Sequence, residues 1–345
     1  MNDSRKFSEV YAELVAGELS PRSVEDAFDA ILAGAWVPVQ IAAFVASLRV
    51  SGETTPIITA AARAMRRAMI PVKHTLPRVV DTCGTGGDNL GTVNLSTGAA
   101  IIVAAAGLPV AKHGNRAMSS QTGSADVLES LGIPVDLAPA AAGEVLAEAG
   151  ITFLFAQAHH PSMRHAAQAR KELGVRTIFN CLGPLANPAG ATHQLLGAPD
   201  ERLRPIMASV LASLGVVSAW VVRGENGLDE MSPSGPTRVS AVSAGAITEL
   251  VVGPEDFGLE PIPIEALRGG NAAFNAGVLE AVLSNEPHAS LNGFLLNAAA
   301  ALVVADGLAP KDAAARAREL IETGAARRQL DKWRQVATAR KNSAR

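Results

Sequence analysis

A change of pattern near residue 76 constrains the fold more than any other feature of the chain. Before it, apolar residues such as Val24, Phe28 and Ile31 recur at helical spacing, and no β-branched run interrupts them. After it, short β-branched runs alternate with glycine-rich loops and helical stretches. This alternation predicts a parallel sheet covered by helices. We therefore expect an α/β fold, with a small all-helical domain joined to a larger α/β domain that has a mainly parallel central sheet.

Local signals place the elements. Ser20 followed by Pro21 is typical of a helix start, with serine as N-cap and proline at the first helical position. Further helices are expected at 38–50, 56–69, 96–106, 124–131, 140–149, 161–173, 203–214, 275–283, 291–305 and 310–323. Strands are expected at 78–82, 109–112, 151–155 and 219–222, with a β-rich stretch at 237–252.

Composition excludes several classes of protein. Hydrophobic residues make up 48% of the 345 residues and charged residues only 18%, which is the balance of a folded chain rather than a disordered one. The net charge of −3 provides no general positive field for nucleic acid or an anionic membrane. Segment 95–111 is apolar but shorter than a membrane span and interrupted by polar residues. We expect no nucleic-acid partner and no membrane partner.

Two cysteines, Cys83 and Cys181, are too few for a disulfide framework, and neither belongs to a C-x-x-C pair. Residues 1–12 lack the basic start and apolar middle of a signal peptide. These features favour reduced thiols and a cytoplasmic location.

The segment 81–98 contains an unusual density of glycine between an expected strand and an expected helix. Glycine tolerates positive φ and lets a ligand approach the main chain, so successive N–H groups can bind an anion in front of the helix N-terminus. Asn94, Ser96 and Thr97 fall where that helix begins, and their side chains can either cap it or bind the anion. A phosphate or pyrophosphate group is the expected ligand.

Two common phosphate motifs are excluded. Gly86 and Gly91 have the spacing of a Walker loop, but Thr92 stands where that loop requires lysine. The dinucleotide pattern G-x-G-x-x-G would begin at Gly84, but its third glycine position is Asn89. A nucleotide cofactor is therefore disfavoured.

A second polar segment, 112–126, also lies between an expected strand and an expected helix. In a parallel sheet it would share one edge, and one cleft, with the first loop. Lys112 and Arg116 supply positive charge, and neutral donors suited to phosphate and ribose oxygens come from Asn115, Ser119, Ser120 and Ser124. A solvated polar loop is the alternative interpretation.

Two further groups are weaker signals by themselves. The adjacent acids Asp229 and Glu230 follow an expected strand and suit Mg²⁺, although an acidic surface turn would look the same. Arg170, on an expected helix, could bind a carboxylate through two parallel hydrogen bonds. For His159 and His160 we favour a structural role, because no acidic or cysteine residues stand at metal-ligand spacing around them.

Taken together, these motifs resemble the anthranilate phosphoribosyltransferase family over essentially the whole chain. The resemblance rests on segments 84–88, 94–97, 112–116, 159–161 and 227–230, in that order. It implies a helical domain at 1–72 with an internal segment near 161–176, an α/β domain at 73–160 and 177–345, and a homodimer. It also implies transfer of a phosphoribosyl group from 5-phosphoribosyl 1-pyrophosphate to anthranilate, with inversion at the anomeric carbon and release of pyrophosphate.

The resemblance also implies roles for particular residues. Two Mg²⁺ ions bound with the donor would involve Ser96, Asp229 and Glu230. Anthranilate would contact Gly84, Asn115 and Arg170, with His113 a candidate beside the amine. The donor would contact Gly84, Gly87, Asp88, Thr92, Asn94, Leu95, Ser96, Thr97, Lys112, His113, Gly114, Asn115, Arg116, Ala117, Met118, Ser119, Ser120 and Ser124.

Two alternatives share the fold. Pyrimidine nucleoside phosphorylases are longer and usually carry Met-Ser after the loop lysine, where this chain has His113 and Gly114. Paralogues that bind nucleic acid without catalysis should show a basic groove and a damaged glycine-rich or acidic motif. Both motifs are intact here.

Overall fold

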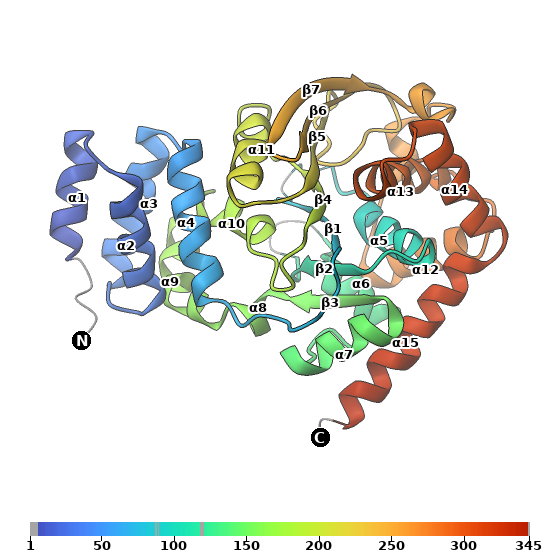
Figure 1. The fold of residues 1–345 in the computed structure, drawn as a ribbon, viewed down its shortest axis with the longest axis horizontal. Coiled ribbons are helices and arrows are strands. Elements are labelled where there is room, and N and C mark those ends of the chain that lie inside the picture. The colour runs from blue at the N-terminus through green and yellow to red at the C-terminus, as the bar shows by residue number, and fades with distance from the viewer. Residues whose placement is uncertain (1–5, 87, 89, 118–120, 344–345) are drawn as a thin grey trace.

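The computed structural model describes residues 6–343, except residues 87, 89 and 118–120. Its N-terminal part consists of four helices at one end of the molecule (Figure 1). The predicted cap of the second helix is confirmed, because the Ser20 hydroxyl accepts a hydrogen bond from the Ser23 amide at 3.1 Å. These helices are α1 (Phe7–Ala16), α2 (Pro21–Leu32), α3 (Pro38–Ser51) and α4 (Thr55–Ala68).

The rest of the described chain is built around a seven-stranded sheet of order β3-β2-β1-β4-β5-β6-β7. The pairs among β1 to β5 are parallel, whereas β6 and β7 extend the sheet as an antiparallel hairpin. The mainly parallel sheet predicted from the sequence is thus confirmed. The strands are β1 (Val80–Gly84), β2 (Val110–Gly114), β3 (Ile151–Phe155), β4 (His193–Gly197), β5 (Ser218–Gly224), β6 (Thr237–Ser243) and β7 (Ala246–Val252).

Helices cover both faces of this sheet. One apolar core surrounds the long buried helix α13, which packs against α5, and a second core joins the N-terminal helices to α10 and α11. Helix α15 extends along α7 toward the C-terminus (Figure 1). The helices of this part are α5 (Leu95–Ala105), α6 (Ser124–Ser130), α7 (Pro139–Ala149), α8 (Ala156–His159), α9 (Arg164–Leu173), α10 (Phe179–Leu185), α11 (Leu203–Ser213), α12 (Ala272–Leu283), α13 (Leu291–Asp306), α14 (Pro310–Glu322) and α15 (Ala325–Ser343), with short 3₁₀ turns at Pro161–Met163, Pro254–Phe257 and Ile264–Leu267.

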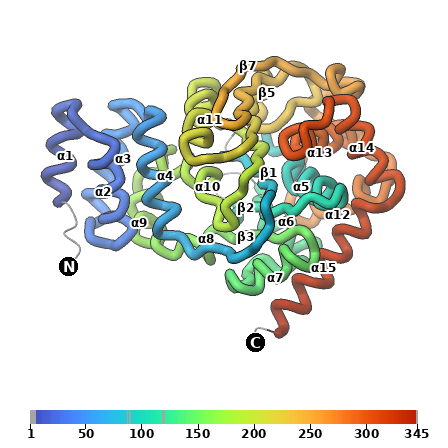
Figure 2. Tube along the Cα trace, in the orientation of Figure 1, coloured from blue at the N-terminus to red at the C-terminus, as the bar shows by residue number. Residues whose placement is uncertain are grey.

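Helix α9 returns to the N-terminal helices although it is far from them in sequence. It packs against α2 and α3, while the following helix α10 packs against α4 (Figure 2). The alanines Ala166 and Ala169 are fully buried on the packed side of α9, and small side chains there allow close helix contact. The interruption of the strand–helix rhythm after residue 160 therefore brings this segment back beside the first helices.

Five elements were not predicted from the sequence: the helices α1, α8, α10 and α15 and the strand β4. Helix α1 is short, and α15 is strongly polar, although its buried residues Leu330, Trp333 and Ala337 follow helical spacing. Strand β4 has only five residues and lies at the centre of the sheet, between β1 and β5. Its position comes from pairing with strands distant in sequence, which no local pattern reveals.

Among the described residues, no single helix is long and apolar enough to cross a membrane. The bent pair α13 and α14 together has the length and composition of a membrane span. Buried core helices of other proteins often have the same length and composition.

Candidate active site at the carboxyl edge of the sheet

Parallel pairing brings both predicted anion-binding loops to one edge of the sheet. Strands β1 and β2 run in the same direction and end at Gly84 and Gly114, so the loops that follow them lie side by side. Together they line a pocket of about 850 Å³. The shared cleft expected from the sequence is present.

Most of the predicted site residues line this pocket: Gly84, Asp88, Thr92, Asn94, Ser96, Lys112, His113, Gly114, Asn115, Arg116, Ala117, Ser124, Arg170, Asp229 and Glu230. Leu95 and Thr97 do not line it, because their side chains are buried at the start of α5. Gly87, Met118, Ser119 and Ser120 lie outside the described residues.

Lys112 occupies an unusual position for a lysine. Its side chain is only 2% exposed, and Nζ donates to the Thr82 carbonyl and to Ser96 Oγ, at 3.1 Å for the latter. Burial lowers the pKa of Lys112, and the nearby Asp81 and Glu230 carboxylates oppose that shift. Burying a cation raises the free energy of the folded protein unless an anion compensates the charge. A buried lysine held beside the Ser96 hydroxyl is therefore suited to bind an anionic ligand.

The pair Asp229 and Glu230 forms the acidic wall of the pocket. Burial raises the pKa of Asp229 well above its usual range, and the neighbouring Asp88 and Glu230 carboxylates add to the shift. Burial likewise raises the pKa of Glu230 to about 7, although the Lys112 ammonium and the Ser96 amide, which donates to Glu230 Oε1 at 3.3 Å, oppose this. Two crowded carboxyl groups with raised pKa values mark a place where a cation would bind favourably.

These residues fit Mg²⁺. Among the described residues, no three or more His, Cys, Asp and Glu side chains are grouped as a ready-made metal cage. Mg²⁺ does not need one, because it commonly takes one or two carboxylates and completes its shell with water and substrate phosphates. The carboxylates of Asp229 and Glu230 and the hydroxyl of Ser96 supply hard oxygen ligands along the same wall.

Arg116 is placed differently from the expectation that its charge is free for phosphate. Its guanidinium makes two hydrogen bonds of 2.6 Å to the Glu129 carboxylate and one of 3.2 Å to Asp126. These partners raise the pKa of Arg116 further. The side chain therefore anchors the second loop to α6, and the Ala117 amide, which donates to Asp126 Oδ2 at 3.0 Å, does the same.

Arg170 meets the requirements of a carboxylate-binding residue. It projects from α9 into the pocket, its guanidinium lies 5.7 Å from the centre of the Phe179 ring, and it makes no ion pair with any described residue. Asn115 lines the opposite loop, where its Oδ1 accepts a hydrogen bond from the Arg116 amide at 2.8 Å. Stacking on an aromatic ring orients the planar guanidinium for parallel hydrogen bonds.

Three buried histidines lie in or near the pocket: His113 lines it, and His159 and His160 lie behind it. His113 Nδ1 donates to the Gly183 carbonyl at 2.9 Å, which leaves Nε2 buried and without a partner among the described residues. Burial lowers the pKa of His113 to about 3 and that of His160 to about 4, so both rings are neutral near pH 7. His159 and His160 do not line the pocket, and His159 Nδ1 donates to the Ile70 carbonyl at 3.0 Å. The structural role favoured for these two agrees with this geometry.

Two residues that shape the site, one lining the pocket and one behind it, carry no local sequence signal. Asn275 of α12 donates from Nδ2 to Asn94 Oδ1 at 2.9 Å, across a separation of 181 residues. Gly197, at the end of β4, lies so close to the Asp229 main chain that a Cβ atom there would fall 1.6 Å from the carbonyl oxygen. Only the folded chain brings these positions together, and glycine at 197 is required for the approach of the acidic segment.

The pocket and fold define a class of protein: an α/β enzyme that binds a phosphorylated substrate at the carboxyl edge of a parallel sheet. Residues 76–327 match the family described as "Glycosyl transferase family, a/b domain". Residues 10–69 match the "Glycosyl transferase family, helical bundle domain".

Individual relatives narrow the class. The chain is 49% identical to the anthranilate phosphoribosyltransferase of Symbiobacterium thermophilum over 92% of this chain and 94% of that one. It is 47% identical to the anthranilate phosphoribosyltransferase of Rhodopseudomonas palustris, over 98% of this chain and 99% of that one. Among solved structures, the enzyme of Thermus thermophilus superposes with a TM-score of 0.90 at 40% identity, covering 95% and 99% of the two chains.

The Saccharomyces cerevisiae enzyme, solved in complex with PRPP and Mg, superposes with a TM-score of 0.89 at 29% identity, covering 96% of this chain and 98% of that one. The chain belongs to the anthranilate phosphoribosyltransferase family. The resemblance drawn from the motifs is thereby confirmed.

Proposed function

We propose that this chain transfers the 5-phosphoribosyl group from 5-phosphoribosyl 1-pyrophosphate to the amine of anthranilate. The products are N-(5-phosphoribosyl)anthranilate and pyrophosphate, and the reaction belongs to tryptophan biosynthesis. One observation carries the proposal most directly: a single pocket combines two anion-binding loops, a pair of buried carboxyl groups and an arginine without an ion pair to any described residue. A phosphorylated donor, a divalent cation and an aromatic carboxylate match these three features.

The donor would occupy the loop after β1 and the loop after β2. Lys112, with Nζ bonded to the Ser96 hydroxyl, lies at the pocket edge where a diphosphate would lie. Such preorganised donors stabilise the negative charge that develops on departing pyrophosphate. Asn94 and Ser124 provide neutral hydrogen-bonding groups in the same pocket.

Mg²⁺ would be held by Asp229, Glu230 and Ser96, and we propose two ions bound with the donor. A structure of the yeast relative contains PRPP and Mg, which supports the choice of metal. When bound, the metal would neutralise charge on the diphosphate leaving group.

Anthranilate would bind with its carboxylate on Arg170 and its amine directed toward Asn115 and His113. A structure of the yeast relative in complex with 4-fluoroanthranilate supports an aromatic acid as the acceptor. The neutral His113 ring lines the pocket, and its Nδ1 donates to the Gly183 carbonyl. We propose direct displacement by the amine with inversion at the anomeric carbon and no covalent enzyme intermediate, so that positioning supplies much of the rate gain.

The test is the loss of anthranilate fluorescence when the protein is mixed with anthranilate, phosphoribosyl pyrophosphate and Mg²⁺. We expect loss that depends on Mg²⁺, with the product identified by chromatography and an EDTA control showing none. Donor binding without fluorescence loss would contradict the proposal and favour a different acceptor or a non-catalytic paralogue.

We also propose that the chain divides into a helical domain, at 1–72 with 161–176, and an α/β domain at 73–160 and 177–345. The packing of α9 on α2 and α3 supports this division. The helical part exposes apolar side chains on α1 and α3, with Val15 70%, Val39 73% and Val50 90% exposed. This surface supports the proposed homodimer, for which light scattering should give a mass of about twice 35.5 kDa. A monomer mass would contradict it.

A further inference from the structure

An arginine outside the predicted site links the glycine-rich loop to the helical part of the molecule. Arg176 follows α9, which ends at Gly174 in the left-handed conformation with φ of 61°. Its Nη1 donates to the Gly86 carbonyl oxygen at 2.8 Å, although the two residues are 90 positions apart. Both residues line the pocket.

Gly86 is held from a second direction. Its N–H acts on the buried Asp229 carboxyl group and opposes the rise in the pKa of that group, while its carbonyl accepts from Arg176. Gly86 has a φ of 65°, a conformation that side chains other than glycine rarely adopt. The turn of the loop is therefore fixed between the acidic wall and the arginine that follows α9.

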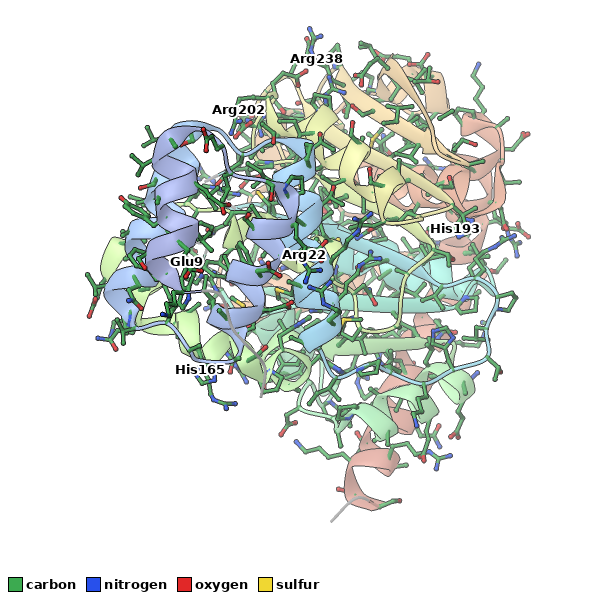
Figure 3. The ribbon with its side chains drawn as sticks, turned by 60° about the vertical axis from the view of Figure 1, so that its left-hand side comes forward. Glu9, Arg22, His165, His193, Arg202 and Arg238 are labelled. Atoms are coloured by element: carbon green, nitrogen blue, oxygen red, sulfur yellow. The ribbon has the colours of Figure 1, made fainter. Side chains whose placement is uncertain are left out.

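A buried acid from the helical part interacts electrostatically with Arg176. Glu53 lies between α3 and α4 with a side chain only 2% exposed, and its Oε1 has no hydrogen-bond partner among the described residues. Arg176 Nη2 is also buried and without such a partner. Arg49, Arg202 and Arg176 act on the Glu53 charge. The exposed Arg202 side chain, labelled in Figure 3, lies 3.9 Å from Glu53 Oε2. The Glu53 and Arg176 charges thus attract each other without a direct ion pair.

We propose that Arg176 is a positioning residue that holds the glycine-rich loop, through the Gly86 carbonyl, in the conformation that binds the diphosphate of the donor. This inference rests on the proposed function of the pocket. Arg170, proposed to bind the acceptor carboxylate, lies six residues earlier on the same segment. This segment therefore contributes one arginine to each of the two proposed substrate sites, and Arg176 acts on the donor through the loop.

The effect of removing this bond should fall on donor binding. The Arg176→Gln variant lacks the guanidinium that binds the Gly86 carbonyl. Binding of the donor must then order the loop, and this lowers the affinity for the donor. A hydrogen bond from a charged group is worth about 1.5–3 kcal/mol, which corresponds to roughly a tenfold or greater change in affinity. We expect about a tenfold higher KM for phosphoribosyl pyrophosphate, with the KM for anthranilate changed by less than about twofold.

The experiment compares four proteins by steady-state kinetics and by calorimetric titration with pyrophosphate in the presence of Mg²⁺. They are the wild type, Arg176→Gln, Arg176→Lys and the control Arg164→Gln. The lysine variant keeps a charged donor and should recover part of the pyrophosphate affinity. Arg164 is an exposed arginine of α9 that does not line the pocket, so its variant should match the wild type.

An unchanged donor KM and pyrophosphate affinity in Arg176→Gln would overturn the inference. A different result would also overturn it: both KM values raised by the same factor, with a lower kcat and a lower melting temperature, in both Arg176 variants. That result would indicate that Arg176 only stabilises the fold. Titration with pyrophosphate does not require turnover. If the wild type binds pyrophosphate but transfers nothing to anthranilate, the proposed function fails while the role of Arg176 in loop positioning is still decided by the binding data.

Discussion

Arg170 and Arg116 show that residue type alone does not decide which arginine binds substrate. Both line the pocket, and both came from motifs that suggested anion binding. The structure pairs Arg116 with Glu129 and Asp126, whereas Arg170 lies beside the Phe179 ring and makes no ion pair with any described residue. An arginine already neutralised by two carboxylates has less to gain from an anionic ligand, so Arg170 is the stronger candidate.

Replacement of Arg170 tests the acceptor site. We expect Arg170→Gln to raise the KM for anthranilate by about tenfold or more, because a charged two-point contact to the carboxylate is lost. The KM for the donor should change little. Initial rates at varied anthranilate check this, with Arg170→Lys as the variant that keeps the charge, and an unchanged KM for anthranilate would remove Arg170 from the site.

Replacement of Asp229 tests the acidic wall. Asp229→Asn keeps the shape of the side chain but removes its charge, so the Mg²⁺ concentration for half-maximal activity should rise about tenfold. Glu225→Gln is the matched control, because Glu225 is an exposed acid near the same strand end that pairs with Arg238 at 3.1 Å. An identical Mg²⁺ titration for Asp229→Asn and the wild type would refute this role.

Among the elements, α5 depends on a glycine that its helical propensity does not explain. Gly98 faces α13, and a Cβ atom there would lie 2.4 Å from Cδ1 of the buried Phe294 ring and 2.9 Å from Leu279 Cδ2. Helix α5 can approach α13 this closely because the position has no side chain. The close approach also fixes the N-terminus of α5, which borders the pocket at Asn94 and Ser96.

We expect Gly98→Ala to lower the free energy of unfolding by about 2 kcal/mol, because overpacking outweighs the gain of about 1 kcal/mol in helix propensity. Gly277→Ala in α12 is the matched control. Nothing lies within 4 Å of a Cβ atom at that position, so the same substitution should stabilise by about 0.5–1 kcal/mol. Denaturant unfolding measures both, and equal effects at the two positions would contradict the packing argument.

At the scale of the whole molecule, buried neutral histidines make stability depend on pH. The His113 and His160 rings lie 5.1 Å apart between β2 and the segment that follows α8. Burial lowers the pKa of His160 from 6.5 to about 4. The unfolded chain therefore binds more protons than the folded one below pH 6.5, so stability is complete above that pH and falls as the pH decreases.

For His160 alone, the pKa difference predicts a loss of about 2 kcal/mol in the free energy of unfolding at pH 5 relative to neutral pH. We expect His160→Gln to be less stable at pH 7 but to lose about 2 kcal/mol less than the wild type between pH 7 and pH 5. Urea unfolding at the two pH values measures this difference. Parallel pH dependences in the two proteins would show that His160 does not contribute.

The sequence by itself determined the class of fold, the family and the two loops that line the pocket. These conclusions depend on short-range patterns: helical spacing before residue 76, strand–loop–helix units after it, and glycine between a strand and a helix. Such patterns are visible because the physical requirement, a buried face or an open main chain, acts within a few residues. Residues 325–343 also carry a helical pattern, since the buried Leu330, Trp333 and Ala337 recur at helical spacing within a polar sequence.

Only the tertiary structure decided which of these residues contact one another and which protonation states they adopt. The central place of β4, the contact of Asn275 with Asn94, and the bond from Arg176 to Gly86 join residues far apart in the chain. The raised pKa of Glu230 and the lowered pKa of His113 have the same origin, since burial is a property of the packed molecule. Local sequence fixes propensity and chemistry, whereas long-range packing fixes proximity and solvation, and the site depends on both.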